Sequence, residues 1–115
     1  MAPLLLVDGD RNFGKALAIG LELDGIPVVT SPDVEDALRR IARQAFGACL
    51  VDCFLPGADA LFSSLAKQAG IRVFATGTYP EVLAGAARRH PWVTTLLKPF
   101  APSAVAAWLA ASARS

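Results

Sequence analysis

The stretch from residue 4 to residue 25, LLLVDGDRNFGKALAIGLELDG, contains two patterns that alternate along the rest of the chain. Leu4 to Val7 is a continuous aliphatic run, which is typical of a parallel strand covered on both faces. From Phe13 to Leu23 the apolar residues are spaced for one face of a helix, and Asp24-Gly25 ends that helix. The stretch therefore predicts a buried strand followed by a helix.

Four more strand-helix units follow the first. The pattern predicts strands over 26–30, 48–51, 71–75 and 93–97, and the helices that follow them over 32–44, 58–69, 80–89 and 102–113. We expect Ser31 to cap the second helix, because Pro32 suits a first helical position, and Trp108 to face the core. Since right-handed crossovers place helices on both faces of a parallel sheet, five such units predict a doubly wound α/β fold with a five-stranded parallel sheet. The small size favours the flavodoxin-like strand order 2-1-3-4-5.

The composition is that of one folded domain, which we expect to span residues 1–115. Hydrophobic residues make up 54% of the chain and charged residues 18%, which argues against intrinsic disorder. Eleven Lys and Arg face ten Asp and Glu, and no basic stretch is dense enough to predict direct nucleic-acid binding. The opening apolar run stops at Asp8, well short of a membrane span or a secretory signal. We expect a cytoplasmic protein in which Cys49 and Cys53 are buried free thiols.

A polar residue stands at the end of four of the predicted strands. Asp8 follows the first strand and Asp52 the third. Thr76 follows the fourth strand and Lys98 the fifth. The predicted strand order makes these strands neighbours, so two carboxylates, a hydroxyl and an ammonium should meet at one edge of the sheet. Such a set favours phosphoryl transfer, in which cations neutralise the oxygens of the moving group and a carboxylate can be the nucleophile. The two carboxylates also offer the hard oxygen ligands that Mg²⁺ prefers.

These residues and their neighbours resemble the response-regulator receiver domain of two-component signalling, the chemotaxis-type receiver. The resemblance covers essentially the whole chain and depends on four short motifs: LLVD ending at Asp8, LVDCFLPG around Asp52, FATG around Thr76 and LLKPF around Lys98. It implies that Asp52 accepts a phosphoryl group and that Thr76 and Lys98 bind this group. It further implies that Asp8, Asp52 and the backbone carbonyl of Phe54 hold Mg²⁺.

The resemblance also implies partners and a backbone feature. A histidine kinase or a phosphotransfer protein would donate the phosphoryl group, and the chain would assist this transfer without turning over as an enzyme does. A downstream protein would bind the face of the fourth helix and fifth strand, near Tyr79, Trp92 and Phe100, although core packing is the default for such rings. Homodimerisation stays open. The Lys98-Pro99 peptide bond would be cis, as is usual in the family.

Three positions depart from the family pattern. The family usually carries two adjacent acids after the first strand, and the second is Gly9 here, which predicts a weakened Mg²⁺ site. Asp10 can reach the metal or cap the following helix, and capping is the commoner use of Asp at such a position. Phe54 stands where a polar or small side chain is frequent, so its ring should crowd the site. Thr95 stands where a switch aromatic is frequent, so any output switch must differ.

Two other functions stay open. The weakened metal site also fits a pseudo-receiver, a docking module that keeps the fold without being phosphorylated. Nucleotide binding is the more distant alternative, because Gly9 to Lys15 matches the first seven positions of a phosphate-binding loop. Ala16 stands where that loop needs a hydroxyl, and Asp8 and Asp10 would place negative charge beside the phosphates. His90 is the only histidine, and we interpret it as a cation at a helix end.

Overall fold

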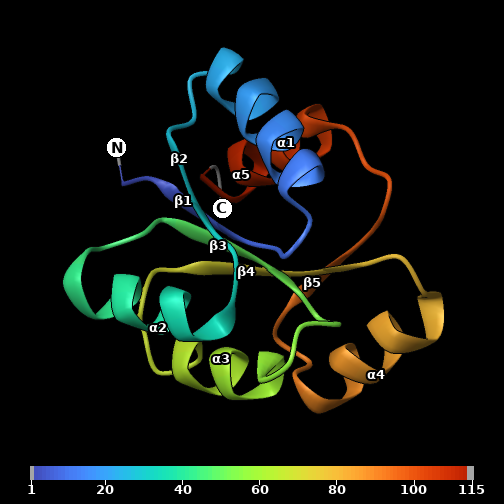
Figure 1. Cartoon of the computed structure of the whole chain (residues 1–115). Coiled ribbons are helices and arrows are strands. Elements are labelled where there is room, and N and C mark those ends of the chain that lie inside the picture. The colour runs from blue at the N-terminus through green and yellow to red at the C-terminus, as the bar shows by residue number, and fades with distance from the viewer. Residues whose placement is uncertain (1, 114–115) are drawn as a thin grey trace.

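The computed structural model describes residues 2–113, and Figure 1 shows how strands and helices alternate along them. In chain order the elements are β1 (Leu4–Val7), α1 (Arg11–Leu23), β2 (Val28–Ser31), α2 (Val34–Arg43), β3 (Ala48–Asp52), α3 (Ala58–Leu65), β4 (Arg72–Gly77), α4 (Pro80–Arg89), β5 (Thr94–Leu97) and α5 (Pro102–Ala113). Every predicted element is present. The largest difference is that α3 ends four residues earlier than predicted, and no other boundary differs by more than two residues.

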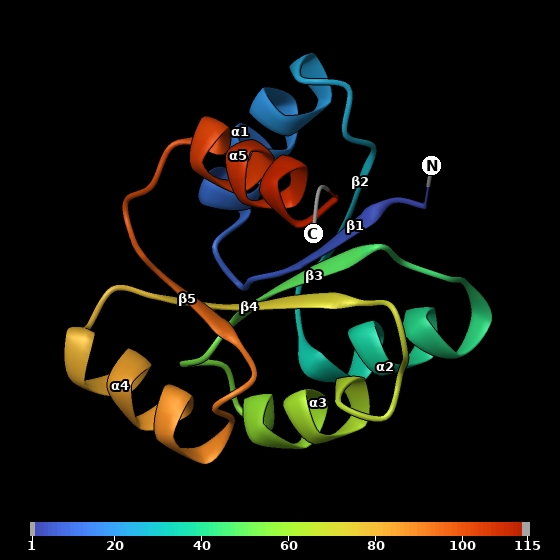
Figure 2. The ribbon, with the colours of Figure 1, turned by 180° about the vertical axis from the view of Figure 1, so that it is seen from behind.

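All five strands are parallel and lie in the predicted order, β2-β1-β3-β4-β5. The register pairs Val7 of β1 with Val51 of β3, and Asp52 of β3 with Thr76 of β4. Helices α1 and α5 lie together on one face of the sheet, and α2, α3 and α4 cover the other face (Figures 1 and 2). Because all strands run the same way, their carboxyl ends and the loops that follow them meet at one edge of the sheet.

Alternate residues of β1 pack into two different cores. Leu5 and Val7 belong to the apolar cluster that includes residues of α2, α3 and α4, whereas Leu4 and Leu6 belong to the cluster that includes residues of α1 and α5. All four side chains are at most 1% exposed. Burial on both faces explains the continuous aliphatic run, and each such side chain stabilises the fold by about 1.5–3 kcal/mol. The central strands thereby give the residues at their ends a rigid base.

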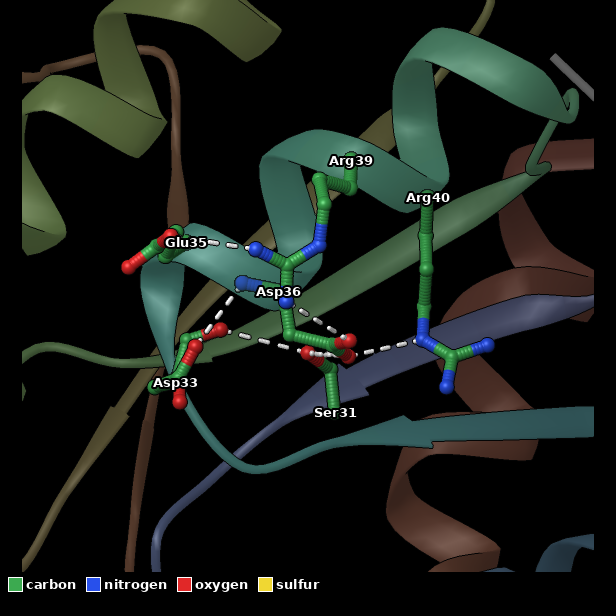
Figure 3. Close-up of polar contacts among 6 residues, drawn as sticks. All are labelled: Ser31, Asp33, Glu35, Asp36, Arg39 and Arg40. Carbon is green, nitrogen blue, oxygen red and sulfur yellow. Dashed lines mark hydrogen bonds and ion pairs between the residues drawn. The ribbon is translucent and has the colours of Figure 1, made fainter.

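Aspartate residues cap the two helices that follow β1 and β2. Asp10 Oδ1 accepts a hydrogen bond from the Phe13 amide at 3.1 Å, so Asp10 has the capping role. The cap of α2 is Asp33, which accepts from the Asp36 amide, and the prediction that Ser31 caps this helix is wrong. Ser31 is instead the last residue of β2, and its buried hydroxyl donates to Asp36 Oδ2 at 2.6 Å (Figure 3). The strand runs one residue further than predicted, which moves the helix start past Pro32.

Two predictions about burial need correction. Trp108 is 47% exposed, whereas Val105 of the same helix is fully buried. The residues of α5 are apolar on all sides of the helix, so its sequence does not indicate which side faces the core. Both cysteines are free, but only Cys49 is buried, and this burial raises the pKa of its thiol to about 12, whereas Cys53 is half-buried. Among the helices of residues 2–113, none combines the length and the apolar character needed to cross a bilayer.

Candidate functional site

Four polar residues meet at the carboxyl edge of the sheet. Asp8 comes directly after β1, Asp52 is the last residue of β3, and Thr76 lies beside Asp52 in β4. Lys98 comes directly after β5. Thr76 therefore lies inside its strand, and not after it as predicted. We refer to Asp8, Asp52, Thr76 and Lys98, the residues selected from the sequence, as the strand-end cluster.

The ammonium of Lys98 lies between the two carboxylates of the cluster. Its Nζ atom is 2.7 Å from Asp8 Oδ2 and 3.6 Å from Asp52 Oδ2. The Asp8 side chain is 1% exposed, and those of Asp52 and Lys98 are 17% and 14% exposed. Since little water reaches these groups, their attraction is much stronger than that of a surface ion pair. One cation thus allows two carboxylates to lie close together.

A backbone amide of its own loop fixes each carboxylate. Asp8 Oδ1 accepts a hydrogen bond from the Asp10 amide at 2.8 Å, and Asp52 Oδ1 accepts one from the Phe54 amide at 3.0 Å. In both residues, therefore, Oδ1 faces the loop and Oδ2 faces Lys98. The two carboxylates make four contacts, two with backbone amides and two with Lys98, and the contact of Asp52 Oδ2 with Lys98 is the longest. Asp52 Oδ2 is therefore the oxygen that can most easily change its partner.

The hydroxyl of Thr76 has no hydrogen-bond partner among the residues that the structure describes, although the residue is fully buried. The Thr76 carbonyl accepts a hydrogen bond from the Cys53 amide at 2.9 Å, which joins β4 to the loop after Asp52. An unpaired buried polar group costs about 1–3 kcal/mol, and such groups occur at functional positions. The Thr76 hydroxyl is available to an oxygen that arrives beside Asp52.

The two carboxylates offer only part of a Mg²⁺ site. Both Oδ2 atoms face one cation, the ammonium of Lys98, so the donors fit a cation between them. Gly9 adds no side-chain ligand, and the carboxylate of Asp10 is engaged in the α1 cap. Within residues 2–113, no three His, Cys, Asp or Glu side chains are grouped so that they could hold a metal ion. Carboxylate oxygens and water are the hard oxygen ligands that Mg²⁺ accepts, so the donor set fits this ion.

The ring of Phe54 lies at the surface. The residue is 67% exposed, and its ring centroid is 5.8 Å from that of Tyr79, which is 56% exposed. The prediction that this ring crowds the site is wrong, because the loop after β3 turns it outward beside the loop after β4. The Phe54 carbonyl stays a predicted Mg²⁺ ligand.

Sequence reasoning missed a different aromatic residue, Phe13 of α1. The Nζ atom of Lys98 lies over its ring, 4.5 Å from the centroid. The Phe100 ring meets the Phe13 ring edge-on, with centroids 5.6 Å apart and planes at 79°. The available signal was that Phe13 stands in the first turn of the helix that follows Asp8, near the edge where the cluster forms.

Gly9 to Lys15 does not form a phosphate-binding loop. Helix α1 already begins at Arg11, Gly14 is buried within the helix, and Lys15 is exposed on it. The carboxylate of Asp10 occupies the helix N-terminus, where a bound phosphate would need free amides. The nucleotide-binding alternative is therefore wrong.

His90 lies at the C-terminal cap of α4, as its predicted place at a helix end requires. Its Nε2 atom is 2.8 Å from Asp59 Oδ1, and the Arg89 Nε group donates to the same oxygen at 3.0 Å. These hydrogen bonds, that of His90 first, lower the pKa of the Asp59 carboxyl below its ordinary value. The contact joins α3 to the end of α4.

Comparison with known proteins gives a result at the level of structure only. No family model matches the sequence, and no curated protein matches it significantly. A CheY-like receiver domain protein from Methanospirillum hungatei is 20% identical, with a TM-score of 0.84 over 97% of this chain and 93% of that one. A two-component response regulator from Clostridium difficile is 18% identical, with a TM-score of 0.85 over 99% of this chain and 97% of the other.

A third similar structure contains ligands. The response regulator protein TrrA from Thermotoga maritima, in complex with Mg²⁺-BeF, is 18% identical and has a TM-score of 0.75 over 87% of this chain and 89% of that one. At such identities the agreement concerns the path of the backbone, and it extends over nearly the whole chain. The chain therefore has the fold of the CheY-like response regulator receiver domains.

Proposed function

We propose that this chain accepts a phosphoryl group on Asp52 from a histidine kinase or a phosphotransfer protein. The observation that carries the proposal is the position of Lys98, whose ammonium is 2.7 Å from Asp8 and 3.6 Å from Asp52. A cation fixed at the carboxyl edge of the sheet stabilises negative oxygens that arrive there. The receiver fold supports the same function, because it places the cluster where open α/β sheets bind ligands.

In the proposed reaction, a carboxylate oxygen of Asp52 attacks the phosphorus atom of a phosphohistidine. A bond forms between this oxygen and phosphorus, the P–N bond of the donor breaks, and the imidazole nitrogen keeps the electron pair. Asp52 Oδ2 is the better nucleophile by position, since Oδ1 accepts the hydrogen bond from the Phe54 amide. The product is an acyl phosphate on Asp52, and the donor regains its free histidine.

The charges of the cluster must rearrange when the phosphoryl group arrives. The two carboxylates and one ammonium carry a net charge of −1, and an acyl phosphate dianion on Asp52 makes that −2. Lys98 would move from Asp8 towards a phosphoryl oxygen and form a charge-assisted hydrogen bond with it. The buried hydroxyl of Thr76 would donate to a second phosphoryl oxygen, which gives this hydroxyl its partner.

Mg²⁺ would be held by Asp8, Asp52 and the carbonyl of Phe54. When bound, it would neutralise part of the charge on the phosphoryl oxygens. We expect its affinity to be low for a receiver, since Gly9 contributes no carboxylate and Lys98 already pairs with Asp8.

The proposed output surface is the face of α4 and β5. Tyr79 is the residue before α4, Trp92 lies between α4 and β5, and Leu97 ends β5; each is at least 44% exposed. Exposed aromatic side chains are enriched at protein-binding surfaces, which supports this proposal. Thr76 lies in β4, two residues before the loop that leads to α4, and phosphorylation would change the surface through this loop. Thr95, also exposed on β5, supplies no aromatic ring to such a change.

A pseudo-receiver is the second candidate function, and Gly9 is the observation that favours it. In that case the cluster would be a structural ion-pair group, and partners would bind the unmodified protein. The two candidates share the fold and differ in whether Asp52 reacts.

Intact-mass spectrometry distinguishes the two functions. The purified chain is incubated with acetyl phosphate and Mg²⁺, and in parallel with a phosphorylated histidine phosphotransfer protein. We expect a mass increase of one phosphoryl group that is absent from the Asp52→Asn variant. An unchanged mass, under conditions that label a receiver of known activity, would overturn the proposal in favour of the pseudo-receiver.

A further inference from the structure

We propose that Phe13 is a positioning residue for Lys98, and that its ring holds the ammonium beside the acceptor carboxylate by a cation–π contact. This inference deepens the proposed function and rests on it. It concerns how the ammonium is held ready between Asp8 and Asp52, which are its two other contacts.

The geometry of Lys98 and Phe13 is that of a strong cation–π pair. The 4.5 Å between Nζ and the ring centroid is well inside the limit of about 6 Å for such contacts. The Lys98 side chain is only 14% exposed, and cation–π attraction grows as water is excluded from the cation. The ring is therefore a third contact of the ammonium, in addition to the two carboxylates.

The Phe13 ring is itself fixed from two directions. The backbone amide of Phe13 donates to the capping carboxylate of Asp10, and this hydrogen bond fixes the first turn of α1. Phe100, two residues after Lys98, packs edge-on against the ring. Lys98 and Phe100 lie in the same loop, and both contact the Phe13 ring. These contacts therefore join α1 to the loop before α5.

An aromatic ring has an advantage over a third carboxylate in this position. It attracts the ammonium without adding negative charge to a cluster whose net charge is already −1. An incoming phosphoryl group is therefore not repelled by the group that holds its cation. The contact with the ring is also weaker than an ion pair, so it adds little to the cost of moving Lys98 from Asp8 towards a phosphoryl oxygen.

The first test measures the contact without any phosphoryl chemistry. Protons over the face of an aromatic ring are shifted upfield, so the ε-methylene protons of Lys98 should resonate upfield of those of Lys15 and Lys67, which are exposed. The spectrum is recorded on full-length protein with ¹³C-labelled lysine. The shift should disappear in Phe13→Leu and persist in Phe13→Tyr. A Lys98 signal at the position of the other two would overturn the inference.

The second test changes the ring electronically at nearly constant size. Phe13 is replaced by 4-fluoro-, 3,5-difluoro- and 3,4,5-trifluorophenylalanine, because each fluorine withdraws electron density from the ring face. We expect the rate of labelling by acetyl phosphate to fall in steps, to about one fifth for the trifluoro ring. Phe13→Tyr should keep the wild-type rate, and every variant of the series should be fully folded at the temperature of the assay. A purely structural role for the ring predicts equal rates throughout, and that result would overturn the inference.

Phe100 supplies the matched control. It touches Phe13 and lies at the same edge of the sheet, and its ring makes the contact with Phe13 and not the one with Lys98. The same fluorine series at Phe100 should leave the rate within about twofold of wild type. Equal graded losses at both positions would overturn the cation–π explanation.

Failure of the proposed function gives a different pattern. If the wild-type protein takes no label from either donor, Asp52 is not an acceptor and the function falls, together with the part of the inference that concerns rate. The lysine spectrum still decides whether Phe13 holds the ammonium. Normal labelling with a flat fluorine series overturns the inference alone.

Discussion

Lys98 Nζ lies 2.7 Å from Asp8 Oδ2, although the two residues are 90 positions apart in the chain. The carboxylate is almost completely buried, and its two oxygens accept from the ammonium and from the Asp10 amide. A buried carboxylate without a cation costs several kcal/mol. The pair therefore joins the first and last strands of the chain, in addition to holding the ammonium near Asp52.

Removal of the ammonium should destabilise the fold. In Lys98→Met the length of the side chain is kept, but Asp8 loses its cation, and we expect the free energy of unfolding to fall by about 3 kcal/mol. Urea denaturation measures this change. Lys15→Met, at an exposed position of α1, is the control and should cost less than about 0.5 kcal/mol.

The double variant Asp8→Asn with Lys98→Met separates the lost ion pair from lost packing. It should regain at least half of the stability lost in Lys98→Met, because the almost completely buried carboxylate of Asp8 is gone and only the more exposed Asp52 is left without a cation. If the double variant is as unstable as the single one, the ion pair does not explain the loss.

Much of the fold could be predicted because the same physical requirement recurs in each unit. A strand buried on both faces needs an aliphatic run, as in Leu4 to Val7, and a helix on one face needs an apolar stripe. The meeting of Asp8 with Asp52 followed from these patterns, since parallel strands end at one edge. Trp108 shows the limit, because a helix that is apolar on all sides gives no signal for its inner face.

The details of the cluster depend on contacts that local sequence does not carry. Ser31 and Asp33 are both good helix caps, and the choice between them depends on where β2 stops pairing with β1. The contact of Phe13 with Lys98 joins the first helix to the last loop, and it exists only because the strand order places β1 and β5 on either side of β3 and β4. No spacing along the chain reports such a contact.

Removal of either of two buried hydroxyls should change the free energy of unfolding, but in opposite directions. Thr76→Val replaces an unpartnered hydroxyl by a methyl group of the same shape, and we expect a gain of about 1 kcal/mol in the free energy of unfolding. Ser31→Ala removes a hydroxyl that donates to Asp36 Oδ2 and to the Asp33 carbonyl, and should cost about 2 kcal/mol. Thermal denaturation of both variants checks the signs. Destabilisation by Thr76→Val would show that its hydroxyl has a partner in the free protein.

Asp10 should affect stability and not metal binding. Asp10→Ala removes the cap of α1 and should lower the free energy of unfolding by about 1 kcal/mol, as Asp33→Ala should for α2. Mg²⁺ affinity, measured by titration calorimetry, should be the same in Asp10→Ala, Asp33→Ala and wild type. A loss of affinity in Asp10→Ala alone would make this carboxylate a metal ligand.

Protonation of the Asp36 carboxylate should lower the stability of the protein in acid. The hydrogen bond from the Ser31 hydroxyl, followed by that from Arg40, lowers the pKa of the Asp36 carboxyl from its ordinary value of 3.8 (Figure 3). Because the pKa is lower in the folded state, the stabilisation is complete above pH 3.8 and is lost as the pH falls through the folded value. Asp36→Asn should be less stable than wild type at pH 7, and the difference should shrink below pH 3.8. Denaturation curves at several pH values test this, and a constant difference would contradict it.

The weakness of the proposed Mg²⁺ site should be reversible at one position. A Cβ atom added at Gly9 would lie 3.5 Å from Leu55 Cδ2 and 3.8 Å from the Pro32 carbonyl, which are ordinary contacts, so the backbone there accepts a side chain without a clash at Cβ. We expect Gly9→Asp to raise Mg²⁺ affinity about tenfold, equivalent to 1.4 kcal/mol, because it adds a hard anionic oxygen beside Asp8. Titration calorimetry measures the affinity, and Gly9→Asn, of the same size without the charge, is the control. Equal affinities in both variants and the wild type would show that Lys98, and not the missing acid, limits metal binding.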